Sequence, residues 1–419
     1  MDIKLHSPES VGMSTTRLDR IKHAMSERLD KSELIGLSTM ISRQGKTVYF
    51  EQQGFSRKED NKLMSPDSLF RLYSMTKPMI CVAFMTLFEQ GKFDLFGPVS
   101  EYIPAFSDLK VLEKDEHGQD KLVSLSQPVA IHHLLTHTSG LVYDFYDDSP
   151  VCQLYRDHQV SYNSDRSLQE FVDVLCTLPL AFQPAEKYLY SVSIDVVGRL
   201  IEIIAEKPLS QFLKETIFEP LAMMDTGFSV PDHKLDRLAS LYGPVDALGK
   251  NLGWKEFINA PAADLDKLLD VSKTHRDEDP YFVRGGLGLI GSAPDYMRFA
   301  QMMLNGGELD GKRILSPKTL ELMHMNHLNQ RLLPIGFGEF KLRGYGFGLG
   351  SRVLVNVAES LMPGSLGEYG WSGAAKTYYW VDPKEELIGL FMTQSMGNWT
   401  LVQRQFQSLV YQAITSSFV

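Results

Sequence analysis

The sequence predicts an α/β plus all-α fold: a central antiparallel sheet flanked by helices and built from both ends of the chain, with a helical domain inserted between them. Strand-like runs lie near both termini, the long segment between them is mostly helical in pattern, and a helical pattern also marks each end. We therefore expect residues 1–95 and 290–419 to form the α/β domain and residues 96–289 to form a mainly helical domain. The active site should lie in the cleft between the two domains.

The N-terminal segment predicts a helix followed by a hairpin. Residues 15–30 carry apolar side chains at helical spacing, and Ser14 precedes them as a capping residue. Two β-rich runs, residues 35–42 and 46–53, then lie on either side of a glycine-containing turn at residues 43–45. These two runs supply the first strands of the expected sheet.

The C-terminal segment predicts the rest of that sheet. Residues 346–355, 376–382 and 386–393 are strand-like, and residues 401–416 have the pattern of a closing helix. Because the two sets of strands are distant in sequence, the middle of the chain must be an insertion. Its helical segments are residues 131–135, 168–175, 194–205, 209–217 and 295–304.

Composition disfavours several classes of partner. The chain of 419 residues has a net charge of −10 and a pI near 5.6, which disfavours a nucleic acid or an anionic membrane. No run approaches the roughly 18 apolar residues of a membrane-spanning helix, and the first residues lack the apolar core of a secretory signal. The three cysteines are too few for a disulfide framework, so we expect a cytoplasmic protein.

A buried helix with a serine at its start is the first candidate for chemistry. The apolar run 79–88 ends near Gly91, and Pro78 is tolerated only in a first helical turn, so the helix must begin near Ser74. Lys77 then projects from the same face as Ser74. Burial and the helix dipole both disfavour a charged lysine there, which is what a general base near neutral pH requires.

The spacing Ser-x-x-Lys is not specific by itself. It recurs at Ser107 and Lys110, in a charged segment with no buried helix behind it, where a surface role is the better interpretation. For Ser74 and Lys77 the alternative is a capping serine followed by a lysine whose amine reaches solvent, and the spacing alone does not decide between the two.

Two further segments support catalysis. Tyr190 lies in a run of small polar residues just before an amphipathic helix, which places a phenol at a turn. Residues 370–377 open a strand with small residues, where backbone N–H groups can approach a substrate closely. A helix-to-loop junction lies at residues 131–141.

With these segments in register, the chain resembles the serine β-lactamase and penicillin-binding superfamily over nearly its whole length. Within it, the resemblance is nearest to the class C-like family VIII carboxylesterases. The resemblance implies a β-lactamase-like fold in which Ser74 is the acylated nucleophile, Lys77 takes its proton, and Tyr190 shares the proton transfer.

The same resemblance implies a binding segment and an oxyanion hole. Trp371, Ser372 and Gly373 match the third motif of the superfamily, on the strand beside the serine. The residue that follows this motif donates a backbone N–H to the oxyanion, together with the N–H of the serine. Those two donors are Ala374 and Ser74 here.

Two departures from the superfamily pattern bear on substrate. Trp371 occupies the position of a lysine that pairs with a substrate carboxylate in β-lactamases, and Val192 occupies the position of an asparagine. Both changes favour a neutral ester over an acylamino-carboxylate. A substitute cation could come from elsewhere, and the candidates are Lys376, Arg343 and Arg352.

Other motifs are better explained by structure. Residues 286–291 match G-x-G-x-x-G, but without the context of a dinucleotide site they predict a glycine-rich turn leading to the helix near Asp295. His133 and His137 lack a third ligand for zinc, so a core or capping role is expected. No G-x-S-x-G elbow supports a Ser-His-Asp triad.

Taken together, these patterns predict a serine carboxylesterase that acts on a small-molecule ester and needs neither a metal nor an organic cofactor. A β-lactamase or D,D-peptidase using the same residues is the nearest alternative. A non-catalytic penicillin-recognising protein is the alternative of another class. The sequence does not predict the acyl chain length, the alcohol, the extent of β-lactam hydrolysis, acyltransferase activity or the oligomeric state.

Overall fold

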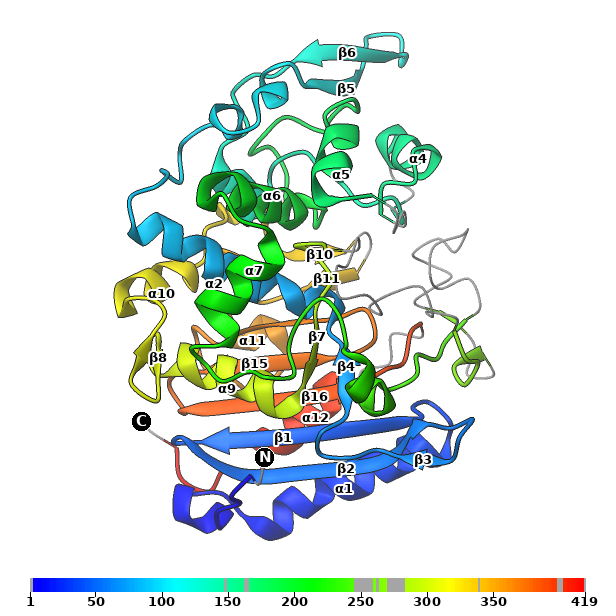
Figure 1. Ribbon diagram of the computed structural model, residues 1–419, viewed down its shortest axis with the longest axis vertical. Helices are drawn as coiled ribbons and strands as arrows, with labels where there is room; N and C mark the ends of the chain where they lie inside the picture. Colours follow the sequence, from blue (N-terminus) through cyan, green and yellow to red (C-terminus); the bar gives the residue numbers. More distant parts are fainter. Residues whose placement is uncertain are drawn as a thin grey trace.

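The computed structural model describes residues 3–146, 149–161, 166–244, 259–260, 264–269, 283–337, 340–397 and 402–417. In this part of the chain, an antiparallel sheet with its flanking helices fills one half of the molecule, and a group of helices fills the other (Figure 1). The buried helix α2 (Thr76–Glu89) lies between the two halves.

Strands from both ends of the chain form the central sheet, as the sequence predicts. All neighbouring strands pair antiparallel, and β1 from the N-terminal segment lies beside β16 from the C-terminal segment. In spatial order the eight strands are β12 (Tyr345–Phe347), β13 (Arg352–Leu354), β14 (Tyr369–Ser372), β15 (Tyr378–Asp382), β16 (Leu387–Thr393), β1 (Gly36–Arg43), β2 (Lys46–Arg57) and β3 (Lys62–Leu63).

The N-terminal helix and hairpin form where the sequence predicts them. Helix α1 (Thr15–Asp30) is capped by the Ser14 side chain, which accepts a hydrogen bond from the Arg17 N–H. Strands β1 and β2 join through Gln44 and Gly45, both with positive φ. Positive φ at both turn residues matches the twist of a tight hairpin.

Helices cover both faces of the sheet, and the alternation of strand residues divides the core between them. Trp380 in β15 packs against Phe406 of α12 (Val402–Tyr411), on the face that α1 also covers. The next ring along the strand, Tyr379, lies on the opposite face and contacts α9 (Ala293–Leu304). Successive side chains of a strand point to opposite faces, so both faces are buried.

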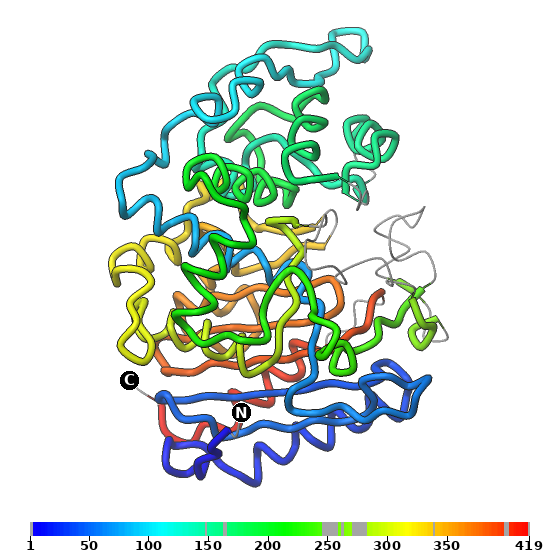
Figure 2. Tube along the Cα trace, viewed as in Figure 1, coloured from blue at the N-terminus to red at the C-terminus, as the bar shows by residue number. Residues whose placement is uncertain are grey.

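The two ends of the chain meet beside the sheet (Figure 2). The Ser14 N–H donates to the Ala413 carbonyl at 2.8 Å, and the Thr415 N–H donates to the Gly12 carbonyl at 2.8 Å. The chain therefore closes on itself next to α1 and α12.

The middle of the chain supplies the helices of the other half, and each segment predicted as a helix contains one. These helices are α3 (Ile131–Leu135), α4 (Pro150–Asp157), α5 (Leu168–Leu175), α6 (Ser193–Ala205), α7 (Leu209–Leu213) and its π-helical continuation η5 (Lys214–Phe218). The hairpin of β5 (Lys110–Lys114) and β6 (Asp120–Ser124) lies among them without a prediction, because its residues are mostly charged and exposed.

Short elements complete the described chain. Among the described residues, no helix is both long and apolar enough to cross a bilayer. The remaining α-helices and paired strands of the described residues are α10 (Pro317–Met323), α11 (Val357–Ser360), β4 (Leu69–Arg71) with β7 (Ile290–Ser292), β8 (Glu308–Leu309) with β9 (Lys312–Arg313), and β10 (Ile335–Phe337) with β11 (Phe340–Leu342).

Two strand predictions need correction. Residues 346–355 contain the end of β12 and all of β13 rather than one strand, because the chain turns where the Gly348 N–H donates to the Ser351 carbonyl and Gly350 has a φ of +99°. Residues 370–377 do not open a strand: β14 ends at Ser372, a turn follows, and β15 begins only after Lys376, whose φ is +63°.

Candidate active site

Ser74 lies in a tight turn at the start of the buried helix. The 3₁₀ turn η2 (Tyr73–Met75) leads directly into α2, so the serine lies at the N-terminal end of the helix, as predicted. Tyr73 has a φ of +47°, which is rare for a residue with a side chain and costs on the order of 1–3 kcal/mol. The Ser74 side chain remains partly exposed, whereas the helix behind it is buried.

Lys77 is the buried group that faces Ser74. Its Nζ lies 3.2 Å from the Ser74 Oγ, 3.0 Å from the Tyr143 hydroxyl and 2.6 Å from the Gly286 carbonyl oxygen. Burial lowers the pKa of Lys77 to about 7, although the carboxylate of Asp195 acts in the opposite direction. A substantial fraction of the amine is therefore neutral near pH 7 and able to accept a proton.

Tyr190 lies beside the same lysine. Its ring centroid is 4.6 Å from the Lys77 Nζ, and its hydroxyl accepts a hydrogen bond from the Trp371 Nε1 at 3.3 Å. Burial raises the pKa of Tyr190, and interactions with the Ser74 and Trp371 side chains oppose this shift. The phenol is therefore protonated at neutral pH and can donate a proton while Lys77 accepts one.

The turn after β14 brings Ala374 toward the serine. A Cβ added to Gly373 would lie 2.4 Å from the carbonyl oxygen of Leu72, so this turn touches the backbone just before Ser74. The Thr377 hydroxyl donates to the same carbonyl oxygen at 3.3 Å. Within the described parts of the chain, the backbone N–H groups of Ser74 and Ala374 have no hydrogen-bond acceptor. Both donors are free to bind an oxyanion.

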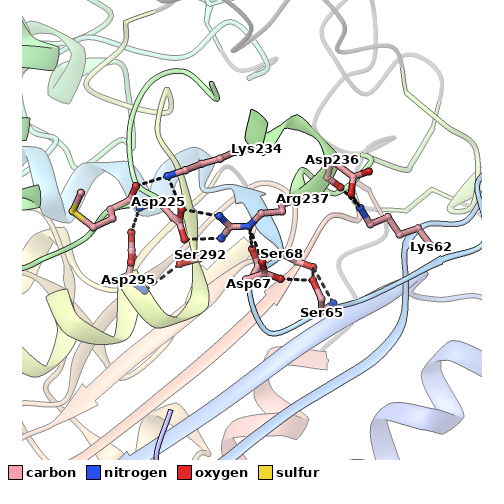
Figure 3. Close-up of polar contacts among 11 residues, drawn as sticks. Lys62, Ser65, Asp67, Ser68, Asp225, Lys234, Asp236, Arg237, Ser292 and Asp295 are labelled. Carbon is pink, nitrogen blue, oxygen red and sulfur yellow. Dashed lines mark hydrogen bonds and ion pairs between the residues drawn. The ribbon is translucent and has the colours of Figure 1, made fainter. Parts of the chain in front are cut away.

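A network of ion pairs anchors the segment that supports this turn. Figure 3 shows Arg237 between two carboxylates: it makes a bidentate pair with Asp225, and its Nε lies 2.9 Å from Asp67. The Asp225 N–H in turn donates to Asp295, in the first turn of α9. A few residues further along this segment, Leu241 packs with Tyr73, Ala374, Ala375 and Met396.

Three residues of the site lie outside the sequence prediction: Tyr143, Asp195 and Gly286. The Asp195 carboxylate accepts a hydrogen bond from the Gly286 N–H at 2.9 Å, and the Gly286 carbonyl accepts from Lys77. A Cβ on Gly286 would lie 2.5 Å from Asp195. The glycine-rich motif at residues 286–291 was the available signal, since close backbone approach is one reason for such a motif.

The described part of the glycine-rich segment is a turn followed by β7 and α9, as expected, rather than the strand–turn–helix unit of a dinucleotide site. The second Ser-x-x-Lys spacing, at Ser107 and Lys110, also has a structural explanation. Ser107 donates to the Pro104 carbonyl, and Lys110 donates to Ser124. Neither contact resembles the pairing of Ser74 with Lys77.

The two histidines have capping and core contacts. The His133 Nδ1 accepts from the Ala130 N–H at the start of α3, while the buried His137 Nδ1 lies 3.2 Å from the Ser191 hydroxyl. Burial, together with the charge of Lys77, lowers the pKa of His137 well below its usual value. In the regions that the structure describes, no cluster of three His, Cys, Asp or Glu side chains is able to hold a metal ion.

The three candidate substitute cations, Arg352, Lys376 and Arg343, differ in hydrogen-bond partners and in exposure. The Arg352 Nη2 donates to Glu368 and to the Tyr378 hydroxyl, and Lys376 donates to Ser395. Burial lowers the pKa of Lys376 to about 8. Arg343 is exposed between β11 and β12. Trp371 itself is buried against Tyr190.

Comparison with known proteins places this geometry in a family. The family model described as Beta-lactamase matches residues 21–410, nearly the whole chain. The chain belongs to this family. The predicted resemblance is therefore confirmed, and so is the β-lactamase-like fold with its large antiparallel sheet flanked by helices.

Relatives within this fold include esterases. An uncharacterized protein of Mycobacterium tuberculosis is 32% identical over 382 residues, which are 90% of each chain. Esterase EstB of Burkholderia gladioli is 28% identical over 382 residues, again 90% of each chain. Among solved structures, EstCE1, a hydrolase with promiscuous acyltransferase activity, has a TM-score of 0.76 at 26% identity, covering 94% of this chain and 99% of its own.

Proposed function

We propose that the chain is a serine carboxylesterase that cleaves short-chain esters through an acyl-enzyme on Ser74. The observation that carries this proposal is the Lys77 amine, 3.2 Å from the Ser74 hydroxyl, with a pKa lowered to about 7 by burial. An amine in that state can take the serine proton as the oxygen attacks a carbonyl carbon.

The proposed reaction uses the other groups in turn. As the bond from the Ser74 oxygen to the substrate carbonyl carbon forms, the carbonyl oxygen gains negative charge, and the N–H groups of Ser74 and Ala374 bind it. The serine proton passes through Lys77 and Tyr190 to the leaving alcohol as the ester C–O bond breaks. Water then attacks the acyl-enzyme, its proton returns to Ser74, and the carboxylic acid leaves.

Several observations favour a neutral ester as the substrate. Trp371 and Val192 replace a lysine and an asparagine of the superfamily pattern, which removes one cation and one amide from the recognition of a carboxylated lactam. The likeness to esterase EstB and to the hydrolase EstCE1 points the same way. The proposed chemistry needs no metal or organic cofactor. The low cysteine content, three in 419 residues, supports a reducing, cytoplasmic setting.

Rates on two substrate classes test this function. We expect kcat/KM for short-chain p-nitrophenyl esters to exceed that for any penicillin by at least about a hundredfold, or about 2.7 kcal/mol in the transition state. Trp371→Lys should narrow this gap by weakening neutral esters and helping carboxylated lactams. Penicillin turnover as fast as ester turnover in the wild-type protein would instead support the β-lactamase alternative.

The nucleophile has its own test within the same assay. Ser74→Ala should abolish ester hydrolysis and labelling by a fluorophosphonate probe while leaving the far-UV circular dichroism unchanged. Ser107→Ala is the matched control, because Ser107 has the same spacing to a lysine but lies on the surface. More than a few per cent of residual activity in Ser74→Ala, or a probe adduct on Ser107, would refute the assignment.

A further inference from the structure

A pocket opens beside the candidate site, at the position where β14 ends. Its walls include Phe337, Phe340 and Leu342 from the β10–β11 hairpin and Trp371 from β14, and two guanidinium groups, Arg352 and Arg404, contribute to its lining. Ser372 also lines the pocket and is two residues from Ala374. Two residues of a fully extended chain span at most about 7 Å, so the pocket begins within about 7 Å of the proposed oxyanion donor.

Two residues of the pocket wall, Phe337 and Trp371, also pack against Tyr190. The Phe337 and Trp371 rings lie 4.9 and 5.2 Å from the Tyr190 ring, and the Trp371 Nε1 donates to the Tyr190 hydroxyl. In the proposed reaction, Tyr190 passes a proton to the leaving alcohol, so the alcohol must lie on the Tyr190 side of the ester bond. The pocket behind Trp371 and Phe337 is next to that position.

We propose that this pocket receives the alcohol part of the ester and selects an aromatic or cyclic alcohol that carries an anionic substituent. The assignment rests on the proposed esterase function and names its alcohol specificity. The aromatic walls of Phe337, Phe340 and Trp371 account for the preference for a ring.

The charge of the pocket accounts for the anionic substituent. The Arg352 guanidinium is paired with the buried Glu368, whereas the side-chain hydrogen bonds of Arg404 go to the backbone carbonyls of Ser360 and Leu361. Among the described residues that line the pocket, none is a carboxylate. Arg404 therefore leaves a positive charge at the pocket wall, available to an anionic group on the substrate.

Two ester series separate this role from an acyl-binding role. The alcohol series is methyl, phenyl and 2-naphthyl butyrate, and the acyl series is phenyl acetate, butyrate and hexanoate. Phe340→Ala removes a partly exposed wall on β11 and should lower the 2-naphthyl-to-methyl ratio of kcat/KM about tenfold, while ratios within the acyl series stay within about twofold. Phe96→Ala, at an exposed aromatic residue outside the pocket, is the matched control and should change neither series.

Charge is tested separately at Arg404. The ratio of kcat/KM for p-carboxyphenyl butyrate to that for phenyl butyrate should fall about threefold in Arg404→Gln, as expected for a partly exposed ion pair. Arg331→Gln, at an exposed arginine outside the pocket, should leave the ratio unchanged. A change confined to the acyl series in Phe340→Ala, or no change in either variant, would overturn the assignment. A wild-type chain inactive on every ester would overturn the esterase proposal itself.

Discussion

Lys77 differs from an ordinary lysine because its amine is enclosed by neutral oxygen atoms rather than by water. It contacts the hydroxyls of Ser74 and Tyr143 and the carbonyl of Gly286, and its side chain has no exposed surface. Burial in this setting disfavours the charged amine, and the Tyr190 ring centroid lies 4.6 Å from its nitrogen. The two residues should act as one unit rather than as two independent bases.

That coupling predicts non-additive kinetics. Lys77→Ala and Tyr190→Phe should each lower kcat by about 10²–10⁴, the usual cost of removing a general acid or base. The double variant should be little worse than the more damaged single variant, because both act on one proton path. Additive losses, measured with p-nitrophenyl butyrate at constant pH, would mean that the two residues serve separate steps.

Asp195 provides a pH-dependent prediction at the same scale. The carboxylate of Asp195 opposes the lowering of the Lys77 pKa, and it holds Gly286, whose carbonyl accepts from Lys77. In the wild type, kcat/KM should fall on the acid side near pH 7, as Lys77 becomes protonated. Removing the negative charge in Asp195→Asn should lower the Lys77 pKa further and move this acid limb to lower pH.

The design of Asp195→Asn separates charge from shape. The amide oxygen can still accept from the Gly286 N–H, so Lys77 should keep its position while losing the nearby carboxylate. The other side chains that act on or contact Lys77 are Ser74, Tyr143, Tyr190, Cys81 and His137, and all remain unchanged. Asp173→Asn, at an exposed carboxylate on α5, is the control. A lower kcat with an unmoved acid limb would indicate a structural role only.

At the scale of elements, the site depends on the turn after β14, which packs against the backbone just before η2. Gly373 lies against the Leu72 carbonyl oxygen and the Thr377 hydroxyl, with no room for a side chain. Gly373→Ala should therefore push the turn away from Leu72 and separate the N–H of Ala374 from that of Ser74. We expect kcat to fall about 10²–10³-fold, the usual cost of losing one oxyanion donor, with a smaller effect on KM.

A glycine outside the site controls for backbone effects. Gly45, in the turn between β1 and β2, has positive φ and no heavy atom within 4 Å of an added Cβ. Gly45→Ala should therefore lower stability slightly and leave kcat unchanged. Equal losses of kcat in Gly45→Ala and Gly373→Ala, measured at a temperature where both variants are folded, would contradict the role assigned to the turn.

The elements also show what a sequence can predict. Ser74 and Lys77 could be predicted from the sequence because they are only three residues apart. The capped helix after Ser14 could be predicted as well, because it follows from local spacing alone. The contacts of Tyr143 and Gly286 with Lys77 could not be predicted, because these two residues are separated from Lys77 by 66 and 209 positions in the sequence. Local pattern also failed at residues 346–355, where a turn with positive φ at Gly350 makes a hairpin out of what reads as one long strand.

At the scale of the whole molecule, one side chain joins the two ends of the chain. Arg43, at the end of β1, has no exposed surface and donates to the carbonyls of Val11, Gly12 and Ser416. It also pairs with the Glu385 carboxylate at 2.6 Å, in the turn between β15 and β16. Both terminal segments are therefore tied to the end of one strand of the sheet that carries Trp371.

This arrangement predicts a stability defect without a catalytic one. Arg43→Leu leaves the buried Glu385 without its charged partner, so the free energy of unfolding should fall by about 3–5 kcal/mol in urea at pH 7. The double variant Arg43→Leu/Glu385→Leu should recover part of that loss, because no unpaired charge remains buried. Below the unfolding transition, kcat/KM should stay near the wild-type value in both variants, since the hydrogen bonds described for Arg43 go to the terminal segments and to the turn between β15 and β16. A double variant less stable than the single one would show that packing, rather than an unpaired charge, causes the defect.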